Sequence, residues 1–170
     1  LPVFLHMTLK WDFWQVGGYL ASWIIIYGLI QAVAPRLTGK NKTPHAVRIQ
    51  LVVFGCLLAL VPAGIAISLT HDFSVVYVVT IGLLLFALLF AMNSALHSFL
   101  IVRFARVDGA SLDIGFYYMA NAGGRLAGTV ASGALYQVYG LGACLWVSAL
   151  LIVFGSLTAL SLPQEESGTA

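Results

Sequence analysis

One arginine lies in the middle of a long apolar segment of this 170-residue chain. Arg125 stands eleven residues after Ile114, in the run GFYYMANAGGRLAGTVASGALYQ. If residues 114–139 form a transmembrane helix, Arg125 lies about 16 Å from the helix end, close to the bilayer midplane. An arginine there costs at least about 2.5–3.5 kcal/mol and by default marks an ion or substrate path. Its planar fork of donors suits the oxygens of phosphate or carboxylate groups.

Two neighbouring stripes follow the same segment. Positions four apart lie almost above one another on a helix, so Tyr117, Asn121 and Arg125 share a face. The adjacent stripe consists of small residues, which let another backbone approach closely; its members are Ala120, Gly124, Gly128 and Ser132. In another interpretation, Arg125 neutralises a buried carboxylate. The predicted spans contain no Asp or Glu, so such a carboxylate must come from another part of the protein. The other candidate for the counter-charge is an anionic substrate.

A second segment carries aromatic groups at helical spacing. Tyr19, Trp23 and Tyr27 recur every four residues, and Gln15 and Gln31 extend the stripe in both directions. Such residues line a cavity or, near the ends of a span, form an interfacial aromatic belt. The central position of Trp23 favours the cavity, so we expect Tyr19, Trp23 and Tyr27 to contact a substrate.

A third segment concentrates its polar groups near one end. Asn93 and His97 are four residues apart, as are Ser94 and Ser98. A buried amide or imidazole costs free energy unless it has a partner, so these side chains should point into the bundle or into a water-filled space. Substrate contact and hydrogen bonding between helices are equal alternatives for Asn93 and His97. Histidine also titrates near neutral pH.

The elements that position these residues follow from composition. The chain is 61% hydrophobic and only 8% charged, against roughly 45–50% and about 25% in a soluble domain, which excludes a cytosolic globular protein. A membrane-crossing helix needs about 20 mostly apolar residues. Five segments qualify and predict an all-α, polytopic membrane helix bundle: about 13–34, 49–70, 73–102, 114–139 and 141–162. The second and fifth are the least polar and can face lipid.

The loops predict the orientation of this bundle. Lys and Arg in short loops stay on the cytoplasmic side, which places the basic loops 35–48 and 103–113 there, together with the tail 163–170. Residues 1–12 then lie outside, and residues 1–9 resemble the end of a preceding helix. Five complete spans plus that sixth correspond to half of a twelve-helix carrier.

Other function classes find little support. A net charge of +2 without a basic stripe argues against nucleic-acid binding. The four histidines are far apart along the chain, and no phosphate loop or nucleophile elbow is present, so we expect no enzyme, cofactor or metal site. Cys56 and Cys144 both lie in apolar stretches, which does not indicate a disulfide framework.

Several of these runs resemble a known family. The arrangement of spans resembles the C-terminal half of a major facilitator superfamily transporter. More narrowly, the organoarsenical efflux permeases of arsenic-resistance operons (ArsJ type) are similar in four runs: VGGYLASWIIIYGLIQAVAPRLTG, FAMNSALHSFLIVRFA, DIGFYYMANAGGRLAGTVASGALYQ and LGACLWVSALL. The resemblance extends over essentially the whole chain.

The resemblance implies a specific activity. It implies an exporter of 1-arseno-3-phosphoglycerate in the inner (plasma) membrane, functionally linked to the glyceraldehyde-3-phosphate dehydrogenase that makes this compound from arsenate. It further implies alternating access between this half and an N-terminal six-helix half. Two alternatives remain: a carrier for another phosphorylated or carboxylated metabolite, and a membrane scaffold subunit in which Arg125 only pairs with a partner helix.

Overall fold

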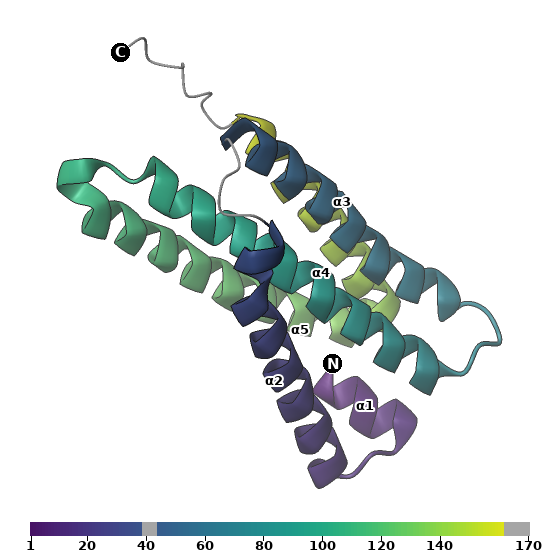
Figure 1. Ribbon diagram of the computed structural model, residues 1–170. Coiled ribbons are helices and arrows are strands. Elements are labelled where there is room, and N and C mark those ends of the chain that lie inside the picture. The colour runs from purple at the N-terminus through teal and green to yellow at the C-terminus, as the bar shows by residue number, and fades with distance from the viewer. Residues whose placement is uncertain (39–43, 162–170) are drawn as a thin grey trace.

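The computed structural model describes residues 1–38 and 44–161, which form helices joined by short turns (Figure 1). The predicted all-α class is confirmed. The elements are α1 (Pro2–Leu9), α2 (Phe13–Thr38), α3 (Pro44–Ser68), α4 (Val75–Phe104) and α5 (Ala110–Thr158), with the short 3-10 helices η1 (Val107–Gly109) and η2 (Ala159–Ser161). Four helices, α2 to α5, are long and apolar enough to cross a membrane, as expected of a membrane helix bundle.

A break at Gly140 divides α5 into two parts. Gly140 has φ 77° and ψ −172°, a conformation essentially confined to glycine. In Figure 1 the chain turns back there, so that the green first part and the yellow second part run in opposite directions. Across the turn, the Cys144 thiol donates a hydrogen bond to the Ser132 carbonyl at 3.4 Å. Residues 110–139 and 141–158 are therefore two antiparallel helical segments.

The helices coincide broadly with the predicted spans. The segment 13–34 lies within α2, and α4 covers most of 73–102; α3 begins at Pro44, before the predicted start at Ile49. The segment 114–139 falls on the first part of α5, and residues 141–161 of the segment 141–162 fall on its second part and on η2. Residue 162 lies outside the described residues. Residues 2–9 are helical as α1, and their assignment to the end of a preceding helix stays a prediction. The centre of the basic loop, residues 39–43, and the predicted tail, residues 163–170, lie outside the described residues.

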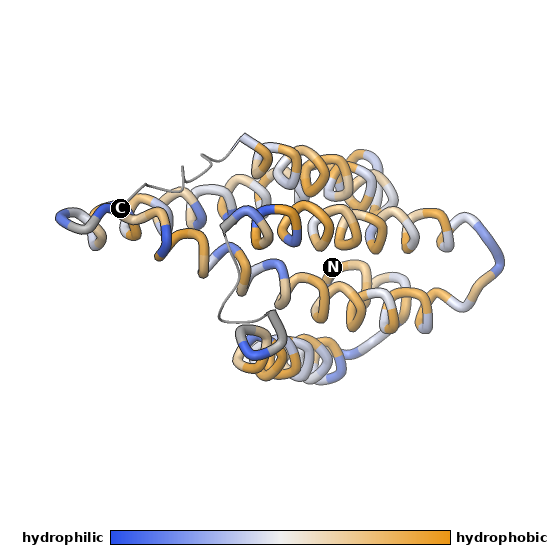
Figure 2. The backbone as a smooth tube through the Cα atoms, turned by 45° about the horizontal axis from the view of Figure 1, so that its top comes forward, coloured by the Kyte–Doolittle hydropathy of each residue, from blue (hydrophilic) through white to orange (hydrophobic). Residues whose placement is uncertain are grey.

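Two hydrophobic clusters lie at opposite ends of the bundle. One joins the start of α3, the end of α4 and η2 through Leu51, Leu96 and Ala159. The other joins α1 to the start of α4 through Leu5 and Val79, with Leu69, Tyr136 and Leu141 packed against it. Each cluster therefore collects alternate helix ends, which defines an up-and-down arrangement. Figure 2 shows hydrophilic residues at the turns, as between α3 and α4.

The helices differ strongly in how much of their surface is buried by neighbouring helices. A large share of α3 is buried, because α3 packs against α4 and against the second part of α5. Small residues allow this close approach: Gly55 of α3 lies directly against Ser156. The outer surfaces of this pair expose large apolar side chains such as Leu60 and Phe154, consistent with the expectation that these segments can face lipid. The first part of α5 and most of α2 are the least covered.

Candidate functional site

The predicted cation lies on the uncovered part of α5. Arg125 is exposed, and so is every residue from Tyr118 to Ala134. One continuous helical segment carries Arg125, which places it about 16 Å along the axis from Ile114. The guanidinium thus projects from the middle of a long apolar helix, as the sequence predicted. Its contact with a substrate stays a prediction.

The polar neighbours of Arg125 leave its guanidinium free. The Asn121 amide donates to the Tyr117 hydroxyl at 3.5 Å, and the Thr129 hydroxyl donates to the backbone carbonyl of Arg125 at 2.8 Å. Within residues 1–38 and 44–161, no carboxylate pairs with the guanidinium. The face predicted from four-residue spacing is therefore continuous, and its charge is not neutralised by the described part of the chain.

The stripe of small residues is open in the same region. A Cβ added at Gly124 or Gly128 would meet no atom within 4 Å among the described residues, apart from the helix itself. The Ser132 hydroxyl donates to the Thr129 carbonyl of its own helix at 3.1 Å. Gly124 and Gly128 therefore pack against no other helix within the described bundle, whereas the Ser132 carbonyl meets Cys144 of the second part of α5. The packing role of the two glycines stays a prediction for another helix.

The aromatic stripe of α2 faces α4 and forms what we call the α2–α4 seam. The Trp23 indole N–H donates to the Leu83 carbonyl at 2.7 Å. The Trp23 and Tyr27 rings stack at 5.9 Å between centroids, and Tyr27 stacks on Phe90 of α4 at 5.4 Å. Hydrogen bonding and ring stacking therefore hold these two helices together. Trp23 and Tyr27 contact another helix here, and their predicted contact with a substrate is not tested by it.

The two ends of the stripe have separate roles. Gln31 donates to the Ser94 hydroxyl of α4 at 3.1 Å, which continues the seam. Gln15 instead caps α2: its backbone N–H donates to the Asp12 carboxylate at 2.8 Å, while the Asp12 N–H donates to the Gln15 side chain at 3.0 Å. This is a reciprocal capping box. Tyr19 packs edge-on against Trp11 at 5.4 Å, near α1.

The polar end of α4 carries two hydrogen-bonded serines beside Asn93 and His97, for which both alternatives stay predictions. Ser94 bonds across to α2, and the Ser98 hydroxyl donates back to the Ser94 carbonyl at 3.0 Å. Asn93 has a buried side-chain oxygen without a hydrogen-bond partner among the described residues. His97 lines a cavity. The serines therefore bond within and between helices, whereas the imidazole faces open space.

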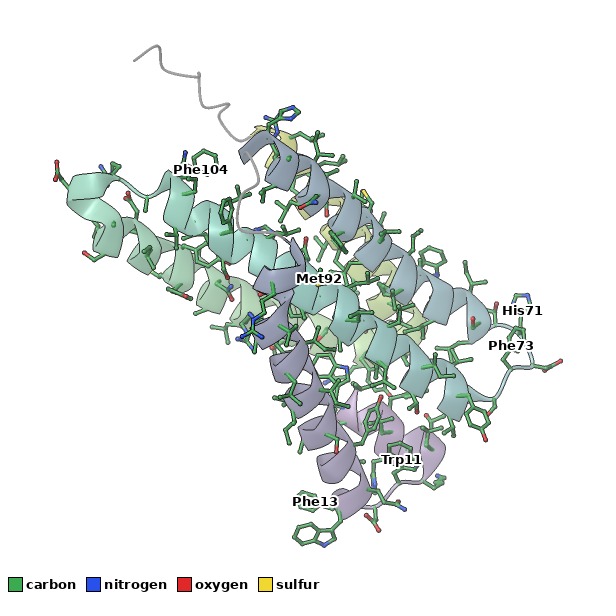
Figure 3. All side chains as sticks on the ribbon, viewed as in Figure 1. Trp11, Phe13, His71, Phe73, Met92 and Phe104 are labelled. Carbon is green, nitrogen blue, oxygen red and sulfur yellow. The ribbon has the colours of Figure 1, made fainter. Side chains whose placement is uncertain are left out.

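This cavity, which we call the α4–α5 cavity, has a volume of about 390 Å³. Its polar lining comes from α4 and both parts of α5: His97, Asp113, Tyr117 and Thr158. Apolar side chains complete it: Leu51, Leu100, Ile101 and Phe104. Phe104, labelled in Figure 3, marks the end of α4 opposite to His71 and Phe73. The cavity thus brings together two of the predicted residues, His97 and Tyr117, at the end of the bundle predicted to be cytoplasmic.

An ion pair beside this cavity was missed by sequence reasoning. The Arg106 guanidinium donates to both oxygens of Asp113, at 2.6 and 2.9 Å, and the Arg106 backbone N–H donates to the same carboxylate at 3.0 Å. These hydrogen bonds lower the pKa of Asp113 from 3.8 to about 2. They raise the pKa of Arg106. The available signal was an arginine and an aspartate seven residues apart across Gly109.

The candidate residues therefore lie in separate places. Trp23 and Tyr27 pack against α4, and Tyr19 packs against Trp11 near α1. Asn93 has a buried side-chain oxygen on α4, and His97 and Tyr117 line the cavity. Asn121, bonded to Tyr117, continues to Arg125 on the open face of α5. No group of three or more His, Cys, Asp or Glu side chains is placed to hold a metal ion within the part of the chain that the structure describes. The chain matches no protein-family model, and comparisons with curated proteins and with solved structures return no similar protein.

Proposed function

We propose that the chain is the C-terminal half of a twelve-helix carrier that exports a small organic anion. The observation that carries the proposal is Arg125, an exposed guanidinium in the middle of an apolar helix, unpaired within the described residues. A cation at this depth is costly in a lipid environment. An anionic substrate offsets that cost, and arginine can hold its oxygens through two parallel hydrogen bonds.

The pattern of coverage supports a second half as partner. The faces of α2 and of residues 110–139 are the most open, and the second of these carries both the cation and the small-residue stripe. A stripe of small residues suits close packing against another helix. We propose that the partner half packs against these faces and encloses the substrate between the two halves, which alternately expose it to each side of the membrane.

The break at Gly140 supports five crossings of the membrane. Residues 110–139 and 141–158 are each long enough to approach the thickness of the hydrocarbon core, and they run in opposite directions. With α2, α3 and α4 they make five spans, preceded by α1. The basic loops favour the cytoplasmic side of an inner (plasma) membrane for the end of α5.

The resemblance to organoarsenical efflux permeases supports a narrower substrate, 1-arseno-3-phosphoglycerate. This compound carries phosphate and arsenate groups, both of which suit a guanidinium. Its supply links the carrier to glyceraldehyde-3-phosphate dehydrogenase. The first alternative is a carrier for another phosphorylated or carboxylated metabolite, whose anionic group can pair with the same guanidinium. A scaffold subunit is the alternative from a different class, with Arg125 paired to a carboxylate of a partner helix.

Substitution of Arg125 tests the proposal. In the full-length protein, Arg125→Lys keeps the charge but removes the bidentate fork, so we expect arsenate tolerance to fall while the protein remains abundant in the membrane. Arg36→Lys makes the same change at the exposed end of α2 and should leave tolerance unchanged. Full tolerance with Arg125→Lys would overturn the role of Arg125. If the gene confers no arsenate tolerance on cells that also express the dehydrogenase, the organoarsenical substrate is excluded.

A further inference from the structure

A long apolar groove runs between α3 and α4, and we call it the α3–α4 groove. Its volume is about 710 Å³, and it shares no lining residue with the α4–α5 cavity. It extends along α3 from Leu57 to Ser68 and along α4 from Ser74 to Leu89. Between these ends the lining is almost entirely apolar and includes Leu60, Ile65, Ile81 and Leu85.

Two glycines shape this groove. A Cβ added at Gly82 would lie 2.5 Å from the side chain of Ile65, so the missing side chain lets α3 and α4 approach closely there. A Cβ added at Gly64 would meet no described atom within 4 Å, so Gly64 leaves space open in the lining. Leu60 and Ile81 are 66% and 62% exposed. The described part of the chain therefore leaves the groove uncovered.

The length of the groove matches one leaflet of a bilayer. The distance from Leu57 to Ser68 is eleven residues, or about 16 Å along the axis of α3. The hydrocarbon core is about 30 Å thick, so one leaflet accounts for about 15 Å. The groove thus runs from the α3–α4 turn to about the bilayer midplane. A transmembrane helix of a partner would extend well beyond it, whereas an acyl chain of one leaflet would not.

The hydroxyl groups of the lining are confined to the end of the groove beside the turn. They belong to Ser68, Ser74 and Tyr77. Figure 2 shows the hydrophilic turn itself, and Figure 3 places His71 and Phe73 in it. Among the described residues, the side chains of Ser74 and Tyr77 form no hydrogen bond. The groove is therefore polar at the membrane surface and apolar in depth, which is the order of groups in a phospholipid.

The turn also carries one carboxylate. Asp72 is exposed directly before Phe73, and it forms no hydrogen bond or ion pair within residues 1–38 and 44–161. The neighbouring His71 is engaged locally, because its Nδ1 donates to the Ile67 carbonyl at 3.0 Å. A negative charge beside the end of the groove attracts a cationic headgroup and repels an anionic one.

We propose that the α3–α4 groove binds one acyl chain of a phospholipid whose headgroup carries an ammonium. The ammonium pairs with Asp72, and the hydroxyls of Ser74 and Tyr77 donate to the phosphate oxygens. In the predicted orientation the turn lies on the outer side, so the lipid belongs to the outer leaflet. This inference goes beyond the proposed function, because it holds for a carrier and for a scaffold subunit alike.

Native mass spectrometry of the full-length protein in detergent tests the proposal. The protein is incubated with equal amounts of phosphatidylethanolamine and phosphatidylglycerol that carry the same acyl chains. The readouts are the fraction of protein with one bound lipid and the ratio of the two lipids in that fraction. We expect phosphatidylethanolamine to be preferred by up to about fivefold, which is what an exposed ion pair supplies.

Substitutions separate the groove from the headgroup contact. Gly64→Leu fills open space in the groove, so most of the bound lipid should be lost. Gly142→Leu makes the same change in open space outside the groove and should retain the lipid. Asp72→Asn should retain the lipid but bring the ratio close to one. Asp12→Asn is the matched control for this charge, because asparagine also caps a helix, and it should leave the ratio unchanged.

Each part of the proposal has a result that contradicts it. Absence of a retained lipid on the unsubstituted protein, or full retention by Gly64→Leu, would overturn the site. Equal binding of the two lipids, or an unchanged ratio with Asp72→Asn, would overturn the ammonium headgroup. If Gly64→Leu is not recovered, Ile81→Trp narrows the groove from α4 and gives the same comparison. Transport is not measured, so failure of this proposal leaves the proposed function untouched.

Discussion

Arg106 and Asp113 close the turn between α4 and α5 with a two-pronged ion pair. Both carboxylate oxygens accept hydrogen bonds from the guanidinium, at 2.6 and 2.9 Å, and the backbone N–H of Arg106 adds a third. The pair spans η1 and ties the end of one long helix to the first turn of the next. It therefore links the end of α4 directly to the helical segment that carries Arg125.

This pair gives the stability of the protein a pH dependence. The pKa of Asp113 is about 2 in the folded protein and 3.8 as the ordinary value. A lowered pKa means that the stabilisation is complete above about pH 3.8 and is lost as the pH falls through about 2. We expect the melting temperature in detergent to fall more steeply over this range for the unsubstituted protein than for Asp113→Asn. Identical slopes would show that the pair adds nothing to stability.

Removal of the Trp23 hydrogen bond should weaken the α2–α4 seam. Trp23→Phe keeps an aromatic ring for stacking on Tyr27 but removes the indole N–H that donates to Leu83. The expected loss is about 0.5–1.5 kcal/mol in the free energy of unfolding, measured by denaturation in detergent. Trp14→Phe is the control, because Trp14 is 82% exposed. Equal effects of the two substitutions would argue against the seam.

Addition of a methyl group at Gly55 should separate α3 from α5. A Cβ at Gly55 would lie 2.8 Å from the Cβ of Ser156 and closer still to its hydroxyl oxygen. Gly55→Ala should therefore cost about 1–3 kcal/mol by overpacking, whereas Gly64→Ala on the same helix meets no described atom within 4 Å. Thermal unfolding measures both. The second substitution Ser156→Gly should restore stability to Gly55→Ala, and failure of this rescue would contradict the contact.

Substitution of Gly140 by alanine tests the turn inside α5, because it affects only the backbone conformation there. No described atom lies within 4 Å of a Cβ added there, so Gly140→Ala changes only the cost of φ 77°. That cost is about 1–3 kcal/mol. Gly142→Ala, also in open space but helical, should be neutral or stabilising by roughly 0.5–1 kcal/mol. A stable Gly140→Ala protein would mean that the two parts of α5 join differently.

The sequence was sufficient for some features because they are local. Long apolar runs predicted α2, α3 and α4, and spacing by four placed Trp23 and Tyr27 on one face. The capping box of Asp12 and Gln15 also carried a local signal, although Gln15 was assigned to the aromatic stripe.

Other features depend on how helices align along one another. The bond between Gln31 and Ser94 joins residues 63 positions apart, and periodicity within one helix does not set the register between two. The same holds for the cavity, which needs α3, α4 and both parts of α5 together. Arg125 could be identified from its depth in the segment, but its exposure depends on which helices cover which faces.

A single glycine joins the two parts of α5, and this has a consequence for biogenesis. In the proposed topology the outer connection has no hydrophilic loop that could cross the bilayer separately. Residues 110–139 and 141–158 must then enter the membrane together, as one helical hairpin. The translocation machinery therefore has to accommodate the costly Arg125 at the same time as the apolar second part.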